Sequence, residues 1–125
     1  MHLARVEAAA RAALKFCEAF NSHDLGALAQ LVDDRCVLET AYLPLDGPAF
    51  RGKQAVLGFW EQVFQRAPHA RMEVEEVFGG GSRSVLRWQG EWPDATGRPV
   101  RTRGVEIFKV SDGLICEHLS YVKGR

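Results

Sequence analysis

The chain has 125 residues, of which 46% are hydrophobic and 26% are charged, as is typical of one globular domain, here taken as residues 1–125. Its 16 Lys and Arg residues balance its 16 Asp and Glu residues. The charge therefore argues against nucleic acid or an anionic membrane as a partner and favours a small apolar ligand. No apolar run approaches the ~20 residues of a membrane span, and Arg and Glu interrupt the N-terminal alanines, so a cytoplasmic protein is expected.

Three helices are predicted in the first half of the chain. Apolar residues recur at steps of three and four over residues 3–20, which predicts an amphipathic helix. Asn21 to Asp24 supplies a stop and a new N-cap, so a second, short helix is expected over residues 25–32. After Gly52 the apolar residues again have helical spacing, and Pro68 lies just past the end of this third helix.

The remaining segments indicate strands and turns. Cys36–Thr40 has the apolar and β-branched content of a strand, and the turn-rich stretch Pro44–Gly52 is interpreted as a connection that could act as a lid. Beyond the third helix the period changes to two, which predicts an antiparallel meander of four strands at Met72–Phe78, Ser84–Trp92, Val100–Val110 and Leu114–Val122. Helices followed by a sheet indicate an α+β domain.

The order of these elements, together with five short motifs, carries a family resemblance. The motifs are Asn21–Leu25, Asp33–Asp34, Phe50–Lys53, Gly104–Phe108 and Asp112–Ile115. In this order and spacing they resemble the nuclear transport factor 2-like (NTF2-like) superfamily, and most closely its SnoaL-like and ketosteroid isomerase-like domains. The resemblance covers nearly the whole chain. It implies a cone-shaped roll, in which a curved antiparallel sheet wraps three N-terminal helices and leaves a deep, mostly apolar pocket.

Two glutamates match the catalytic carboxyl positions of the isomerase-like members, which use Asp at both sites. The resemblance implies that Glu39, on the first strand, is the carboxylate base. It implies that Glu106 is the acid that donates a hydrogen bond to the substrate's oxyanion. Strand alternation places Glu106 on one face with Thr102, Gly104 and Phe108, and the resemblance selects that face as the inner one. An apolar pocket keeps a desolvated carboxyl group protonated, whereas a carboxyl group near the mouth stays ionised.

A third member of the isomerase site is missing. The tyrosine that these relatives carry in the first helix is matched by Phe16, which has no hydroxyl group to donate. A lost oxyanion donor typically lowers the rate by ~10²-fold or more. Tyr42 and Tyr121 are the candidates to replace it.

His118 is the third candidate catalytic residue. On the last strand it shares a face with Cys116 and Ser120, and the resemblance turns that face inward. His118 is then expected to lie near Glu106, where it either orients the carboxyl group or carries a proton itself.

The cysteines give no sign of a disulfide or a zinc site. Cys17, Cys36 and Cys116 are odd in number and have no paired spacing, so reduced thiols are expected. The spacing of Cys116 and His118 does not establish the hydrogen-bonded geometry of a thiolate nucleophile. A metal site formed by His118, Glu106 and Glu39 is left open, although no compact ligand motif supports it. No metal and no cofactor are expected.

Aromatic residues are predicted to line the pocket. Trp88, Trp92 and Phe108 fall on the inferred inner face, where they either sandwich a flat apolar ligand or simply fill the core. The predicted substrate-binding residues are Phe16, Phe59, Trp60, Trp88, Trp92, Phe108 and Cys116.

Two functions remain open, and with them the question of whether the chain is an enzyme. The first is a cofactor-independent enzyme in which Glu39 removes a proton α to a carbonyl group, and Glu106, helped by His118, stabilises the enolate. Isomerisation and intramolecular aldol cyclisation share this step. Epoxide opening is disfavoured because Arg101 and Arg103 alternate toward the outer face. The alternative is a non-catalytic small-molecule-binding or association module.

A homodimer is predicted through the outer face of the sheet. That face mixes apolar and polar side chains in a way that suits a two-fold contact better than solvent. The residues concerned are Val85, Arg87, Gln89, Val105, Ile107, Leu119 and Tyr121.

Overall fold

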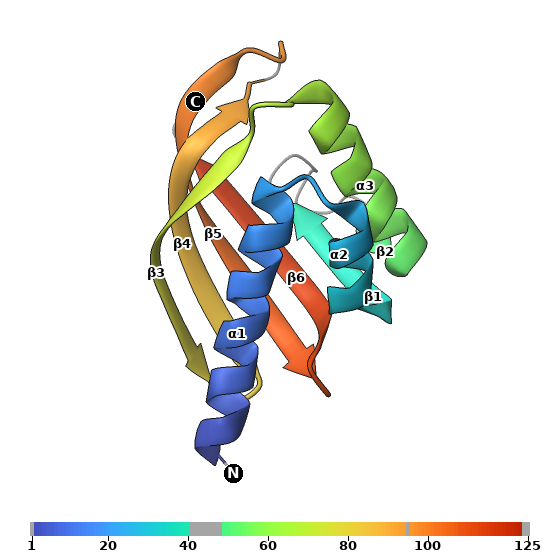
Figure 1. The fold of residues 1–125 in the computed structure, drawn as a ribbon, viewed down its shortest axis with the longest axis vertical. Helices are drawn as coiled ribbons and strands as arrows, with labels where there is room; N and C mark the ends of the chain where they lie inside the picture. The colour runs from blue at the N-terminus through green and yellow to red at the C-terminus, as the bar shows by residue number, and fades with distance from the viewer. Residues whose placement is uncertain (1, 41–48, 95, 124–125) are drawn as a thin grey trace.

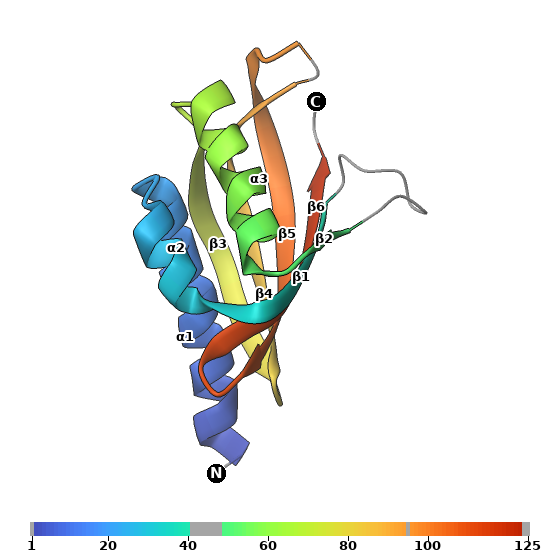
Figure 2. The same ribbon diagram turned by 90° about the vertical axis from the view of Figure 1, so that its right-hand side faces the viewer.

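Three helices lie against one face of a curved six-stranded sheet in the computed structural model, which describes residues 2–40, 49–94 and 96–123 (Figure 1). The helices are α1 (His2–Asn21), α2 (Leu25–Leu31) and α3 (Lys53–Arg66). The strands are β1 (Val32–Thr40), β2 (Phe50–Arg51), β3 (Arg71–Gly80), β4 (Arg83–Pro93), β5 (Pro99–Ser111) and β6 (Leu114–Lys123). Figure 2 shows all three helices on the same side of the sheet, so the α+β cone predicted from the sequence is confirmed.

The helices follow the predicted apolar pattern closely. In α1, Ala13, Phe16, Cys17 and Phe20 are buried at steps of three and four residues and face the sheet. The side chain of Asp24 accepts a hydrogen bond from the backbone N–H of Ala27 and caps α2, as expected. Helix α2 ends one residue earlier than predicted. The chain then enters β1 at once, so the Asp33–Asp34 pair lies in a strand and not at the helix end.

The sheet is mixed. Its strand order is β2-β1-β6-β5-β4-β3, and β3 to β6 form the predicted antiparallel meander. Strand β1, however, runs parallel to β6, with Leu38 opposite His118 and Thr40 opposite Ser120. Apolar alternation assigns the faces of a strand but not the direction of its neighbour. Strand β2 lies at the end of the predicted connection, whereas residues 44–48 and their lid role lie outside the described residues.

The Asn21–Asp24 segment also holds the edge of the sheet. The side-chain amide of Asn21 accepts from the N–H of Met72 and donates to its carbonyl, both at 2.8 Å. The ring of His23 stacks on Phe64, and its Nε2 lies 3.2 Å from the carbonyl oxygen of Ala70. The junction between α1 and α2 is therefore fastened to the beginning of β3.

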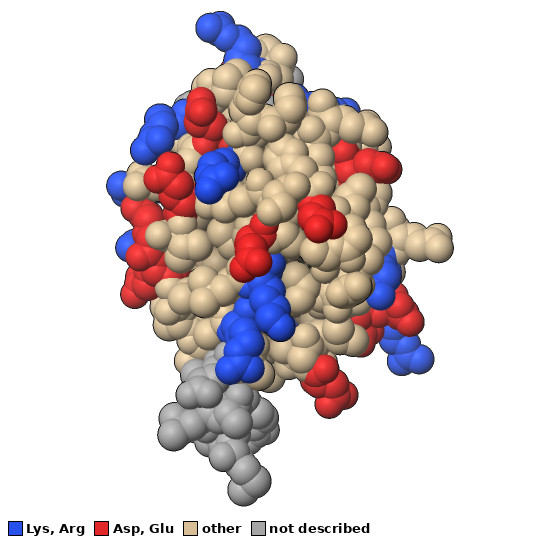
Figure 3. Space-filling model, viewed as in Figure 1, with Lys and Arg blue, Asp and Glu red and all other residues tan. Residues whose placement is uncertain are grey.

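Charged residues are spread over the surface. Acidic and basic side chains lie interspersed on the face drawn in Figure 3. On the opposite, outer face of the sheet, Arg83 pairs with Glu117 and Arg87 pairs with Glu76. No helix among the described residues is both long and apolar enough to cross a membrane.

Candidate active site

The carboxyl group of Glu106 lies at the centre of a buried polar cluster on the inner face of the sheet. Its side chain is completely buried. Oε1 lies 2.7 Å from Nε2 of His118. Oε2 accepts two hydrogen bonds, one from the indole N–H of Trp88 at 2.8 Å and one from the hydroxyl of Ser120 at 3.1 Å. Three adjacent strands, β4, β5 and β6, thus supply the four side chains, which we call the Glu106 cluster.

Strand register explains why these residues meet. Glu106 lies opposite Ser120, and His118 lies one inward-facing position away, opposite Phe108. Trp88 is opposite Gly104. A Cβ atom at Gly104 would overlap the indole of Trp88. The absence of a side chain at this position is therefore what lets the indole lie across β5 and reach the carboxyl group of Glu106.

Aromatic rings enclose His118. The ring of Phe16 meets the imidazole edge-on with a centroid separation of 4.8 Å, and Phe108 lies at 4.4 Å. Trp60 stacks over it at 5.7 Å. Only 2% of His118 is exposed. Water is therefore largely excluded, and electrostatic interactions within the cluster are stronger than they would be at the surface.

The contact between Glu106 and His118 requires a shared proton. Two bare lone pairs would repel each other at 2.7 Å, so one proton lies between Oε1 and Nε2. If that proton is on Nε2, Glu106 is a carboxylate, and the lone pair of a neutral imidazole is on Nδ1. The pair therefore has the composition of a general acid/base centre in a dry site.

Glu39 does not join this cluster. Cys36 and Leu38 are the buried residues of this part of β1, and Glu39 between the inward positions is exposed. It lies beside Leu119 on the outer face. The prediction that Glu39 and Glu106 face one interior from opposite walls is therefore wrong, because β1 turns Leu38 inward and belongs to the same sheet as β5.

Of the two tyrosines predicted to replace the missing donor, the structure describes Tyr121. Tyr121 is 53% exposed and lies opposite Val105 on the outer face, so it is not a replacement for the missing hydroxyl at Phe16. Tyr42 lies outside the described residues. Arg101 and Arg103 are exposed, as expected from their positions on β5.

The predicted pocket-lining aromatic residues pack against one another. Trp88, Trp92 and Phe108 are on the inner face and buried, as expected. The indoles of Trp88 and Trp92 contact each other at a centroid distance of 5.5 Å and an angle of 42°. Phe59 is half-buried and contacts Trp60 at 4.9 Å. In this conformation these rings fill the core, so a deep pocket beside Glu106 stays a prediction.

The cysteines are poorly suited to nucleophilic chemistry. Burial, reinforced by the charge of Glu106, raises the pKa of Cys17 to about 11, and burial raises that of Cys36 to about 12. Cys116 lies at a bulge between β5 and β6, and its thiol donates to the carbonyl oxygen of Lys109. Within the part of the chain that the structure describes, no three His, Cys, Asp or Glu side chains are grouped to hold a metal ion.

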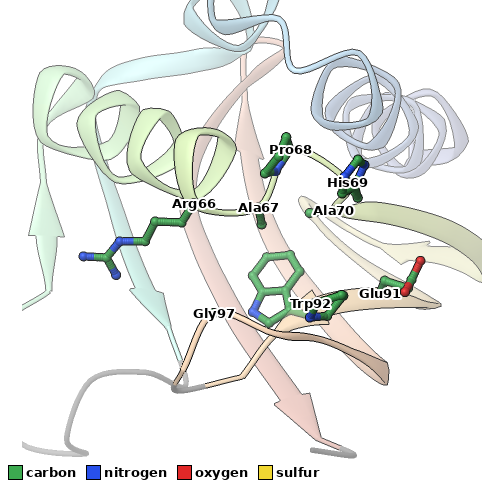
Figure 4. Close-up of a pocket in the computed structure, with 9 residues that line it drawn as sticks. Arg66, Ala67, Pro68, His69, Ala70, Glu91, Trp92 and Gly97 are labelled. Carbon is green, nitrogen blue, oxygen red and sulfur yellow. The ribbon is translucent and has the colours of Figure 1, made fainter.

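A cavity of about 130 Å³ opens at the end of the sheet where β4 and β5 are joined. Figure 4 shows the indole of Trp92 lying across it, with the side chains of Arg66 and Glu91 extending to opposite sides. Neither Glu106 nor His118 lines this cavity. A ligand bound there would contact Trp92 and the turn around Pro68, not the Glu106 cluster.

Sequence reasoning missed three features of the cluster. Ser120 was placed on the correct face but given no role, and Trp88 was expected to contact a ligand and not a carboxyl group. Gly104 is expected on the inner face and belongs to a motif, but the sequence predicts no role for it. Its position inside a strand was the available signal, because a glycine there often marks a close approach by another group.

Comparisons with known proteins show which sequences and structures the chain resembles. The family model described as the SnoaL-like domain matches residues 13–118. An NTF2-like protein of unknown function from Mesorhizobium loti is 33% identical. Its crystal structure superimposes with a TM-score of 0.80, over 96% of this chain and 94% of that one. A candidate ketosteroid isomerase from Kribbella flavida has a TM-score of 0.78 at 19% identity, over 96% of this chain and 81% of that one, which shows the fold alone.

A curated relative is much longer. A GTP cyclohydrolase 1 type 2 homolog from Halobacterium salinarum is 31% identical over 88 residues, which are 70% of this chain but 31% of that protein. The chain thus spans less than a third of the length of this relative.

Proposed function

The chain belongs to the SnoaL-like domain family of the NTF2-like superfamily, and we propose that it is a cofactor-independent acid/base enzyme acting on a small apolar carbonyl compound. The proton-transfer centre is the pair formed by Glu106 and His118. The observation that carries this proposal is the 2.7 Å contact between Oε1 and Nε2 of two side chains that are almost completely buried.

In this mechanism His118 is the base in place of Glu39. The Glu106 carboxylate accepts the hydrogen bond from Nε2–H and so leaves the lone pair on Nδ1. Nδ1 removes the proton α to the substrate's carbonyl group, the C–H bond electrons form the enolate, and Glu106 stabilises the resulting imidazolium ion. Returning the proton to another carbon completes an isomerisation. Alternatively, the enolate carbon attacks a second carbonyl group, and the oxygen of that group takes the proton from Nδ1 of His118, which completes an aldol cyclisation.

Access to His118 requires motion. Phe16 and Trp60 cover the imidazole in this conformation, so a substrate reaches it only when one of these rings moves aside. A flat apolar substrate suits the site because it can take the place of a ring against the same aromatic neighbours. The Kribbella flavida protein is described as a candidate ketosteroid isomerase, and the isomerisation of a ketone is a reaction of the same class.

The second candidate is a small-molecule-binding module without catalysis. Two observations favour it. Glu39, which matches the base of the isomerase-like members, is exposed, and Phe16 stands where their oxyanion tyrosine would be. Under this alternative the Glu106 cluster only stabilises the core.

In either case we propose that two copies associate through the outer face of the sheet. Phe78, Val85, Ile107 and Leu119 lie opposite one another across β3, β4, β5 and β6 and form an apolar row. The Arg83–Glu117 and Arg87–Glu76 pairs flank this row. A mixed row of this kind suits a two-fold contact. Sedimentation as a dimer at tens of micromolar is expected, and a monomer would contradict it.

The cytoplasmic location stays a prediction from the sequence.

Deuterium exchange into a panel of ketones distinguishes the two functions. The protein is incubated in D₂O with cyclic ketones, β-diketones and steroid 3-ketones, and NMR follows deuterium incorporation at the α carbon. An enzyme with this centre exchanges the α proton of at least one ketone faster than buffer does. The variants His118→Asn and Glu106→Gln should lower that rate by about 100-fold or more.

The pair formed by Arg83 and Glu117 on the outer face supplies the matched control. Glu117→Gln alters a carboxyl group on β6 next to His118 in sequence but on the outer face, and should exchange at the wild-type rate. Saturable binding of a ketone without any exchange above buffer would contradict the enzyme and support the binding module.

A further inference from the structure

The indole of Trp88 occupies the side of the Glu106 carboxyl group that faces away from His118. Its N–H donates to Oε2 at 2.8 Å, and the hydroxyl of Ser120 donates to the same atom at 3.1 Å. Oε1 is left to His118 alone. The two carboxyl oxygens, which are chemically equivalent in a free glutamate, therefore have different partners here.

Because Oε1 and Oε2 of Glu106 have different partners, only one of them can share a proton with His118. The last torsion of a glutamate is broad and roughly two-fold, so a carboxyl group without fixed partners rotates and exchanges its oxygens. Two donors on Oε2 hold the carboxyl plane and leave no place for a proton on that atom. The proton is then confined to the line between Oε1 and Nε2 of His118.

The indole is itself held in place. Trp88 is completely buried and contacts Trp92 at 5.5 Å. The strand beneath it has no side chain at Gly104, where a Cβ atom would overlap the ring. Of the two donors, the indole is the more rigid, because its N–H direction is fixed by the ring plane, whereas the O–H of Ser120 takes its direction from its hydrogen-bond partner.

We propose that Trp88 is a positioning residue for the acid/base pair: its indole N–H fixes the carboxyl group of Glu106 so that His118 presents a defined tautomer, and Gly104 is the residue that admits the indole. This inference rests on the proposed function, since positioning has a catalytic consequence only if His118 transfers a proton. The sequence predicts that Trp88 contacts the ligand. In this proposal it acts instead through Glu106.

The test compares Trp88→Phe and Gly104→Ala with Gly80→Ala. Gly80 also lies in a strand, but a Cβ atom there meets no atom within 4 Å. The ¹⁵N shifts of the His118 ring, assigned with His118→Asn, report which nitrogen carries the proton. We expect Trp88→Phe and Gly104→Ala to change these shifts and Gly80→Ala to leave them unchanged. For a ketone that exchanges, kcat should fall about 10-fold or more in the first two variants, with KM little altered.

A second measurement does not depend on the stability of these variants. In the wild-type protein, the indole N–H proton of Trp88 should exchange slowly with solvent, and its chemical shift should move in Glu106→Gln. Unchanged His118 shifts in folded Trp88→Phe, or an indole shift that is the same in wild type and Glu106→Gln, would overturn the proposal. If no ketone exchanges but the NMR results are as expected, the proposed function fails while the positioning of the proton stands.

Discussion

On the inner face of the sheet, the carboxyl group of Glu106 is fully buried and has three hydrogen-bond partners, whereas on the outer face Glu117 has an arginine partner that is about half exposed. Both residues are glutamates on neighbouring strands, and both are paired at distances under 3 Å. The two carboxyl groups differ in their exposure to solvent. A charge pair in water is screened and contributes little, whereas removing one member of a buried pair leaves the other without a partner. Burial, not the presence of a carboxyl group, therefore marks the candidate site.

Loss of the buried carboxyl group is the largest expected effect. Glu106→Ala leaves the imidazole of His118 and the donors of Trp88 and Ser120 without their acceptor in a dry core. The free energy of unfolding should fall by about 3–5 kcal/mol, as measured by urea denaturation followed by circular dichroism. Glu106→Gln should cost less, because the amide oxygen still accepts. A loss below about 1 kcal/mol in the alanine variant would show that the cluster is no stronger than a surface pair.

Adding a methyl group at Gly90, on the inner face of the sheet, should have the next largest effect on stability. A Cβ atom at Gly90 would overlap the backbone carbonyl oxygen of Arg71, where β3 crosses close to β4. Gly90→Ala should therefore destabilise the protein by about 1–3 kcal/mol, read from the same urea curves. Gly80→Ala, on the outer face with open space around it, is the control. Equal stability of the two variants would mean that β3 is not packed as closely as described.

The buried thiols predict a dependence of stability on pH. Burial raises the pKa of Cys17 to about 11 and that of Cys36 to about 12, both above the value of 9.0 for a free thiol. The unfolded chain therefore loses these protons first. The stabilisation is complete below about pH 9 and is lost as the pH rises toward 11 and 12. Urea midpoints should fall more steeply over this range in the wild type than in the double variant Cys17→Ala, Cys36→Ala. Parallel pH curves would contradict the burial of these thiols.

The outer face supplies the smallest effect. Glu117→Gln removes the charge that pairs with Arg83 at 2.9 Å, but both side chains are well exposed. Stability should change by less than about 1 kcal/mol, and less still at high salt. A larger, salt-resistant loss would mean that this pair is shielded from solvent, as it would be inside a dimer interface, and the dimer in solution would then have to be examined with the same variant.

Most of the fold could be predicted from periodicity. The helices after Leu3, Asp24 and Gly52 and the four-strand meander follow directly from apolar spacing. The parallel pairing of β1 with β6 could not be predicted, because the contacts that select it join residues 32–40 to residues 115–120, far apart in the sequence. Alternation within a strand carries no information about such a partner.

The candidate site was predicted in part, and one strand explains the error. The prediction that His118 lies near Glu106 is confirmed, because alternation groups the residues of each strand into faces and the resemblance turns both of these faces inward. In β1, by contrast, Cys36, Val37 and Leu38 are all apolar, so the pattern does not choose a face, and the resemblance assigned Glu39 to the wrong one. The contact of Trp88 with Glu106 depends on the register between β4 and β5, which only the structure shows.

A crystal structure with a bound phenol tests the central claim most directly. A flat phenol mimics an enolate and should bind where the substrate does. We expect the carbon ortho to its hydroxyl group, which corresponds to the α carbon of an enolate, to lie within about 3.5 Å of Nδ1 of His118. Phe16 or Trp60 should have moved aside, and the bond between Glu106 and His118 should be retained. A phenol bound in the cavity beside Trp92, with His118 still covered by its aromatic neighbours, would contradict it.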